Sequence, residues 1–158
     1  MCFSILFITA AVVACILLYC KRIIFSPAAA ALLLLLFLGI VFGSTVFTRN
    51  PSKDYKYELE LFWSWKAVRR GSREMLKENL LNMVLLLPAG ILLPVTFRHK
   101  VSWWKGLIIG ILISAVIETS QLIFRRGLFE WDDMIHNGIG CMIGCMFSSC
   151  FIRRKGKR

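Results

Sequence analysis

The sequence predicts an all-α membrane protein, a bundle of about five transmembrane helices with an extracytoplasmic amphipathic segment between helices 2 and 3. The first observation is composition: 58% of the 158 residues are hydrophobic and only 18% are charged, with a mean hydropathy of +0.68. A soluble domain normally contains about 45–50% apolar and about 25% charged residues. The second is that the apolar residues form blocks of helix-spanning length, which disfavours a β-barrel. At this length, the chain forms one small bundle.

Uncharged runs of about 20 residues mark the expected spans. They lie at residues 1–20, 23–48, 80–97, 103–124 and 134–152. The first run has no basic residue ahead of it, unlike a signal peptide, so we interpret it as a helix. The chain is therefore divided into two leading helices (1–48), an amphipathic interfacial connection (49–78), a three-helix core (79–152) and a basic cytoplasmic tail (153–158).

Charge distribution predicts the orientation of a multi-pass protein of the cell membrane. Five spans divide the 20 basic residues equally between the two sides, but all nine acidic residues fall on one side. Eight of the ten basic residues on that side lie in the long 49–77 connection. The positive-inside rule applies to short loops and tails, which favours a cytoplasmic C-terminus and an outside N-terminus. The basic tail is then a lipid-binding anchor, not a nucleic-acid site.

The 49–78 connection mixes aromatic, apolar and charged residues, a composition typical of the headgroup zone. We expect an interfacial helix or a lid over the mouth of the bundle; a solvated amphipathic linker is the alternative. A helix is expected to begin near Ser72, with Met75 as the capping partner.

The cysteines are expected to act as small apolar residues, because all six fall within or at the ends of apolar spans. Cys141 and Cys145 share a helix face, but no CxxC pair is present. His136 lies beside Asp132 and Asp133, and we interpret it as an interfacial histidine. The sequence predicts neither a metal site nor a cofactor.

Polar residues within the apolar spans are the candidate site. A carboxylate at the centre of a membrane helix costs about 2.5–3.5 kcal/mol on insertion scales, so Glu118 requires a partner or a watery cavity. Pro88 is expected to kink the third span and free the carbonyl of Val84. A GxxxG pair, Gly140 and Gly144, should allow close helix approach. The topology then brings six polar residues to one depth: Asn82, Glu118, Gln121, Arg126, Asp133 and Asn137.

These residues resemble the VanZ-like membrane family over about residues 75–150. The resemblance rests on the run from Asn82 to Gly90 that ends in Pro-Ala-Gly, the Glu118-x-x-Gln121 pair, and Arg126-Gly-x-Phe-x-x-Asp-Asp with Asn137 and Gly140. The family takes its name from a protein associated with resistance to teicoplanin, a lipid-tailed glycopeptide that acts at the outer membrane face. The resemblance implies a small helical bundle.

Three functional interpretations follow. In the first, Arg126 and the basic, aromatic 49–78 segment bind an anionic lipid headgroup, an envelope polymer or a lipoglycopeptide, while Glu118 and Asp133 hold the arginine in place. In the second, the protein is an intramembrane enzyme for a lipid-linked substrate, with Glu118 as general base. In the third, the six polar groups only join helices. Whether a reaction is catalysed and the oligomeric state are both left open.

Overall fold

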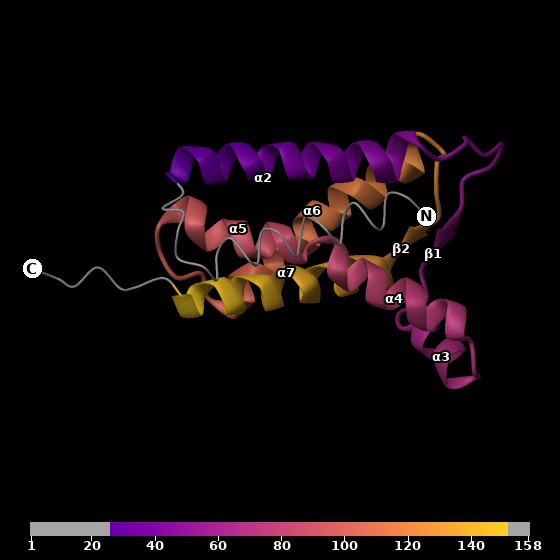
Figure 1. Cartoon of the computed structure of the whole chain (residues 1–158). Helices are drawn as coiled ribbons and strands as arrows, with labels where there is room; N and C mark the ends of the chain where they lie inside the picture. Colours follow the sequence, from indigo (N-terminus) through magenta and orange to yellow (C-terminus); the bar gives the residue numbers. More distant parts are fainter. Residues whose placement is uncertain (1–25, 152–158) are drawn as a thin grey trace, which may run out of the picture.

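A computed structural model describes residues 26–151; the expected first span lies outside this range, as do Cys2, Cys15 and Cys20. The helices and strands are α2 (Pro27–Phe42), the π-helical turn η1 (Gly43–Phe47), β1 (Tyr57–Glu58), α3 (Trp63–Arg69), α4 (Arg73–Leu85), α5 (Leu87–Phe97), α6 (Trp103–Ile123), β2 (Phe129–Glu130) and α7 (Trp131–Phe151). The fold is a helical bundle, as predicted, with helices packed along a common direction (Figure 1).

Three helical segments are long and apolar enough to cross a membrane: Pro27–Phe47, Arg73–Phe97 and Trp103–Ile123. The first and third have 21 residues each, and a helix of that length spans about 30 Å, the thickness of a bilayer core. Ser26 begins α2, because its Oγ accepts a hydrogen bond from Ala29 N at 3.1 Å and Pro27 follows at the first helical position.

The third span begins earlier than residue 80, at Arg73, and is interrupted once. Ser72 Oγ accepts a hydrogen bond from Met75 N at 3.3 Å, which confirms the predicted cap. The interruption lies at Leu86, where α4 ends and α5 begins ahead of Pro88. The carbonyl of Val84 was expected to be free, but it accepts a hydrogen bond from Leu86 N. This tight turn therefore gives the Val84 carbonyl a hydrogen-bond partner, which Pro88 cannot provide because it has no N–H.

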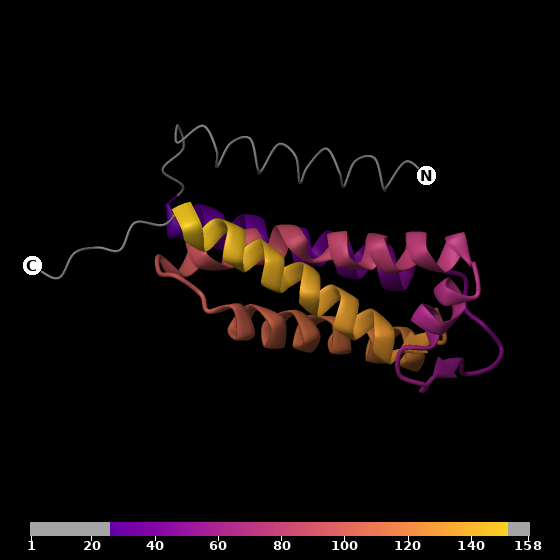
Figure 2. The same cartoon turned by 90° about the horizontal axis from the view of Figure 1, so that it is seen from below.

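Helix α7 packs against α4, α5 and α6, and crosses the bundle between α4–α5 on one side and α6 on the other (Figure 2). Glycines make this packing close. A Cβ built on Gly140 would lie 1.7 Å from Met83 O, and one on Gly144 would lie 2.3 Å from Leu87 O. The GxxxG prediction is confirmed. Cys141 and Cys145 are free and fully buried in the core, where they act as small apolar residues.

Residues 57–69, which we call the arm, connect α2 to α4 at one end of the bundle (Figure 1). We call this end, where η1 and α6 finish and α7 starts, the pocket end. In the arm, β1 pairs in parallel with β2, with Tyr57 opposite Phe129 and Glu58 opposite Glu130. This short pairing holds the arm against the turn that leads into α7.

Candidate functional site

A pocket of about 410 Å³ lies at the pocket end, between the arm, α4 and the start of α7. Its lining combines an arginine, three carboxylates and two asparagines with a few apolar side chains. The lining residues are Arg49, Trp63, Ser64, Met75, Glu78, Asn79, Leu81, Asn82, Leu128, Glu130 and Asp133.

Two of the six predicted site residues, Asn82 and Asp133, line this pocket. They are bonded to each other, because Asn82 Nδ2 donates to Asp133 Oδ1 at 2.5 Å. The bond joins α4 to the first turn of α7, where the helix dipole favours a negative charge. This pair therefore shapes one wall of the pocket.

Glu118 and Gln121 lie behind the pocket and are 3% exposed. Glu118 Oε2 accepts a hydrogen bond from Glu130 N at 3.2 Å, and Gln121 Oε1 accepts one from Arg49 Nη1 at 3.3 Å. A glycine at position 127 leaves room for the Gln121 side chain, because a Cβ there would lie 2.3 Å from Gln121 Oε1. Neither Glu118 nor Gln121 is among the residues that line this pocket. Both residues position the groups that do.

The first interpretation placed Arg126 against Glu118 and Asp133. In the structure, Arg126 interacts with neither of them. Its Nη1 donates to the carbonyls of Phe47 and Arg49, at 2.7 and 3.3 Å, just beyond the end of η1. A cation is favourable at a helix C-terminus, where carbonyls lack helical partners. Among the described residues, Arg49 instead supplies the positive charge that faces the pocket.

Asn137 lies one helical turn deeper than Asp133 and contributes to the helix interface, not to the pocket. Its Nδ2 donates to Ser114 Oγ on α6 at 2.9 Å, and its Oδ1 has no hydrogen-bond partner among residues 26–151. Both side chains are at least 98% buried. Ser114 was not identified from the sequence, because a serine in an apolar helix often bonds only to its own backbone.

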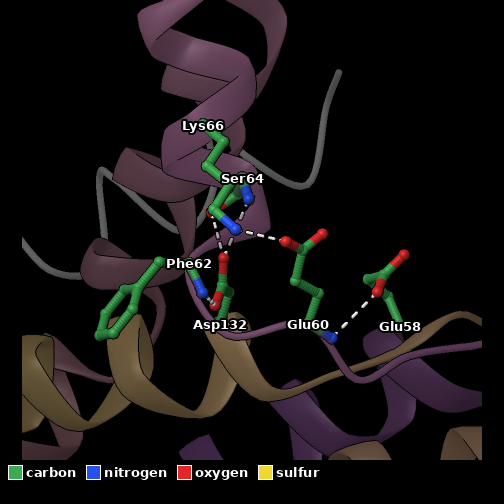
Figure 3. Close-up of polar contacts among 6 residues, drawn as sticks. All are labelled: Glu58, Glu60, Phe62, Ser64, Lys66 and Asp132. Carbon is green, nitrogen blue, oxygen red and sulfur yellow. Dashed lines mark hydrogen bonds and ion pairs between the residues drawn. The ribbon is translucent and has the colours of Figure 1, made fainter.

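Asp132 holds the arm against the start of α7 (Figure 3). Its Oδ1 accepts from Phe62 N at 2.6 Å, and its Oδ2 accepts from Ser64 N at 3.0 Å and Ser64 Oγ at 2.5 Å. Phe62 has a left-handed φ of 60° and gives α3 no side-chain cap. Asp132, from a distant part of the chain, therefore supplies the cap that α3 lacks.

His136 is a second attachment point for the arm. Trp65 Nε1 donates to His136 Nε2 at 2.8 Å, and His136 is 1% exposed. The arm therefore covers His136. Among the described residues, no group of three His, Cys, Asp or Glu side chains could hold a metal ion.

Glu130 lines the pocket just before α7. Burial, followed by the nearby carboxylates Asp133, Glu78 and Asp132, raises the pKa of Glu130 from its ordinary 4.5 to about 7. The folded protein thus holds this proton more tightly than the unfolded chain does. The resulting contribution to stability is complete below pH 4.5 and is lost as the pH rises through about 7.

We therefore expect the unfolding midpoint of the purified protein to fall between pH 4.5 and 7 more steeply in the wild type than in Glu130→Gln. Thermal unfolding in detergent, measured by circular dichroism at several pH values, tests this. Identical pH profiles for the two proteins would contradict the assignment to Glu130.

Arg49, Glu78, Asn79 and Glu130 line the pocket but were not identified as site residues. Arg49 could have been recognised because it directly follows an apolar span, at the depth where a charged side chain meets the headgroups. The other three carried no distinguishing signal. Their roles follow from the position of the arm, which is fixed by contacts about 70 residues apart in sequence.

Comparison with known proteins agrees with the motifs around this pocket. No curated protein and no solved structure matches the chain. A sequence model described as VanZ/LLP1 matches residues 7–152, a range that includes the arm, the pocket and the helices around them. Since this match covers far more than half of the sequence, the chain belongs to the VanZ/LLP1 family.

Proposed function

We propose that this VanZ-like membrane protein acts at the outer membrane face, where it binds or remodels a cell-envelope lipid or polymer and so contributes to glycopeptide resistance. The observation that carries the proposal is the charged pocket of about 410 Å³ at one end of an otherwise apolar bundle. Among residues 26–151, this is the pocket in which an arginine and carboxylates meet beside apolar side chains. Such a mixture suits a molecule with a polar head and an apolar tail.

The depth of the pocket supports a ligand that comes from the membrane surface. The segment Pro27–Phe47 is long enough to cross the bilayer core, and Arg49 follows two residues later. The pocket should therefore lie at the level of the lipid headgroups. The orientation inferred from the charges would turn this level toward the outside of the cell.

The position of Glu118 favours a binding function over catalysis. A general base must come within hydrogen-bond reach of the proton that it removes. Glu118 is 3% exposed, is bonded to Glu130 N and is not a lining residue of the pocket. This arrangement supports a positioning role. An enzyme acting here would draw its carboxyl groups from Glu78, Glu130 or Asp133.

The proposal is tested by teicoplanin susceptibility in a Gram-positive host that expresses the chain at matched membrane levels. We expect the wild type to protect, and both Arg49→Ala and Asp133→Asn to lose most of this protection, because each removes a charge from the pocket. Lys105→Ala is the matched control, since Lys105 is exposed in the first turn of α6, at the other end of the bundle.

Two results would contradict this proposal. If the wild type does not protect, the chain does not confer the resistance. If the wild type and both pocket variants protect equally while labelled teicoplanin binds the cells unchanged, the pocket is not the functional site.

A further inference from the structure

Among the described residues, the pocket contains opposite charges that form no ion pair with each other. Glu78, Glu130 and Asp133 face it with Arg49. Within the part of the chain that the structure describes, the one ion pair is Lys66 with Glu60, outside this pocket. Within residues 26–151, the Arg49 guanidinium donates to the amide of Gln121 and to no carboxylate. Charged groups that share a pocket without pairing are available to a ligand with charges of its own.

Asn79 adds an unused acceptor to the pocket. Its side chain lines the pocket and is 2% exposed, and its Nδ2 donates to Ser64 Oγ at 3.2 Å. Its Oδ1 has no hydrogen-bond partner among residues 26–151. An amide oxygen in the wall of a pocket can accept a hydrogen bond, so this atom is a place where a ligand N–H would be stabilised.

The pocket lining therefore offers groups for both signs of ligand charge. A guanidinium binds a phosphate through two parallel hydrogen bonds. Carboxylates and the Asn79 oxygen together match the three donors of a primary ammonium. An anionic ligand without an amine would leave three carboxylates facing it, and a quaternary ammonium has no N–H to donate. A ligand with a phosphate and a primary ammonium a few bonds apart satisfies both the guanidinium and the carboxylates.

We propose that the pocket binds a phosphoethanolamine-type zwitterion, with its phosphate on Arg49 and its ammonium among Glu78, Glu130, Asp133 and the oxygen of Asn79. This inference rests on the proposed function and names the ligand class of the same site. Because the pocket lies at headgroup depth, the ligand is either phosphatidylethanolamine or a soluble or polymer-borne group with the same chemistry.

The test measures lipid binding to the purified full-length chain in detergent by native mass spectrometry. The probes are short-chain phosphatidylethanolamine, phosphatidylglycerol and phosphatidylcholine. We expect the ethanolamine lipid to bind about tenfold more tightly than the other two, as the loss of a charge-assisted hydrogen bond would predict. Soluble glycerophosphoethanolamine serves as a competitor. Competition at concentrations near those of the lipid assigns the ligand to a soluble or polymer-borne group, and weak competition assigns it to the lipid.

Variants separate the contributions of the carboxylates from that of Arg49. Glu78→Gln and Glu130→Gln should each reduce the preference for ethanolamine over glycerol about tenfold. Arg49→Lys should weaken binding of all three lipids, because lysine loses the two-bond contact with phosphate. Glu74→Gln is the matched control: Glu74 is exposed in the first turn of α4 and does not line the pocket.

The outcomes distinguish this inference from the proposed function. Equal affinity for the ethanolamine and glycerol lipids, with binding still weakened by Arg49→Lys, would overturn the zwitterion assignment and leave the pocket as a binding site. A preference that persists in Glu78→Gln and Glu130→Gln would also overturn the assignment. If none of these pocket variants changes the binding of any lipid probe, the proposed function fails as well.

Discussion

Replacing Gly140 with alanine is expected to prevent the bundle from folding. The added Cβ would lie 1.7 Å from the carbonyl oxygen of Met83 and 2.7 Å from its carbon, so helices α4 and α7 would have to separate. Overpacking usually costs about 1–3 kcal/mol, and a clash between rigid backbones lies at or above the upper end of this range. The yield of monodisperse protein in detergent, followed by its unfolding midpoint, measures the effect.

Gly39→Ala provides the matched control. Gly39 is also a helical glycine, in α2, but a Cβ there would meet no atom of residues 26–151 within 4 Å. Alanine should favour the helix at this position by up to about 1 kcal/mol. If Gly140→Ala folds as well as Gly39→Ala does, the close approach of α4 and α7 is not required for folding.

Asp132→Asn is expected to release the arm while leaving the bundle folded. The aspartate accepts three hydrogen bonds with two oxygens, whereas asparagine has one oxygen and would turn an NH₂ group toward N–H or O–H donors. Hydrogen bonds to a buried charged group contribute about 1.5–3 kcal/mol each, so a loss of about 3 kcal/mol is expected. That loss corresponds to a roughly hundredfold increase in the open population of the arm.

Hydrogen exchange of the α3 amides, compared with those of α6, measures this release. Asp54→Asn is the control, because Asp54 is an exposed aspartate in the same connection between α2 and α4. Faster exchange in α3 alone is the expected result for Asp132→Asn. Unchanged α3 protection would show that Asp132 does not hold the arm, and faster exchange in every helix would assign it a global role instead.

The positions of the helices could be predicted from the sequence because they depend on local properties. The apolar run at 23–48 corresponds to the helical segment at 27–47 in the structure, and the apolar run at 103–124 corresponds to α6. Hydropathy and length decide such segments, since every backbone group of a membrane helix is paired within the segment itself. The cap at Ser72 and the close approach at Gly140 were also predictable, because each follows from a motif within a few residues.

The partners of the polar side chains could not be predicted in the same way. Arg126 and Arg49 both adjoin apolar spans, but only the fold shows which of them faces the pocket. The choice depends on the turn after α6, where Arg125 has a left-handed φ of 53° and Arg126 is directed toward the end of η1. Arg125 and Arg126 are neighbours in this tight turn, but their side chains point in different directions. Their spacing in the sequence does not show which direction each one takes.

Patterns within the sequence predicted a helical membrane protein of the VanZ-like type, with polar residues gathered at one end of its bundle. Composition, span length and short motifs carry that information locally. Three features appear only in the tertiary structure: Asp132 and His136 hold the arm, Glu118 and Gln121 lie behind the pocket and position residues that line it, and Arg49 lines the pocket together with three carboxylates. These pairings join residues in different elements, 12 to 72 positions apart in the sequence, so they exist only in the folded chain.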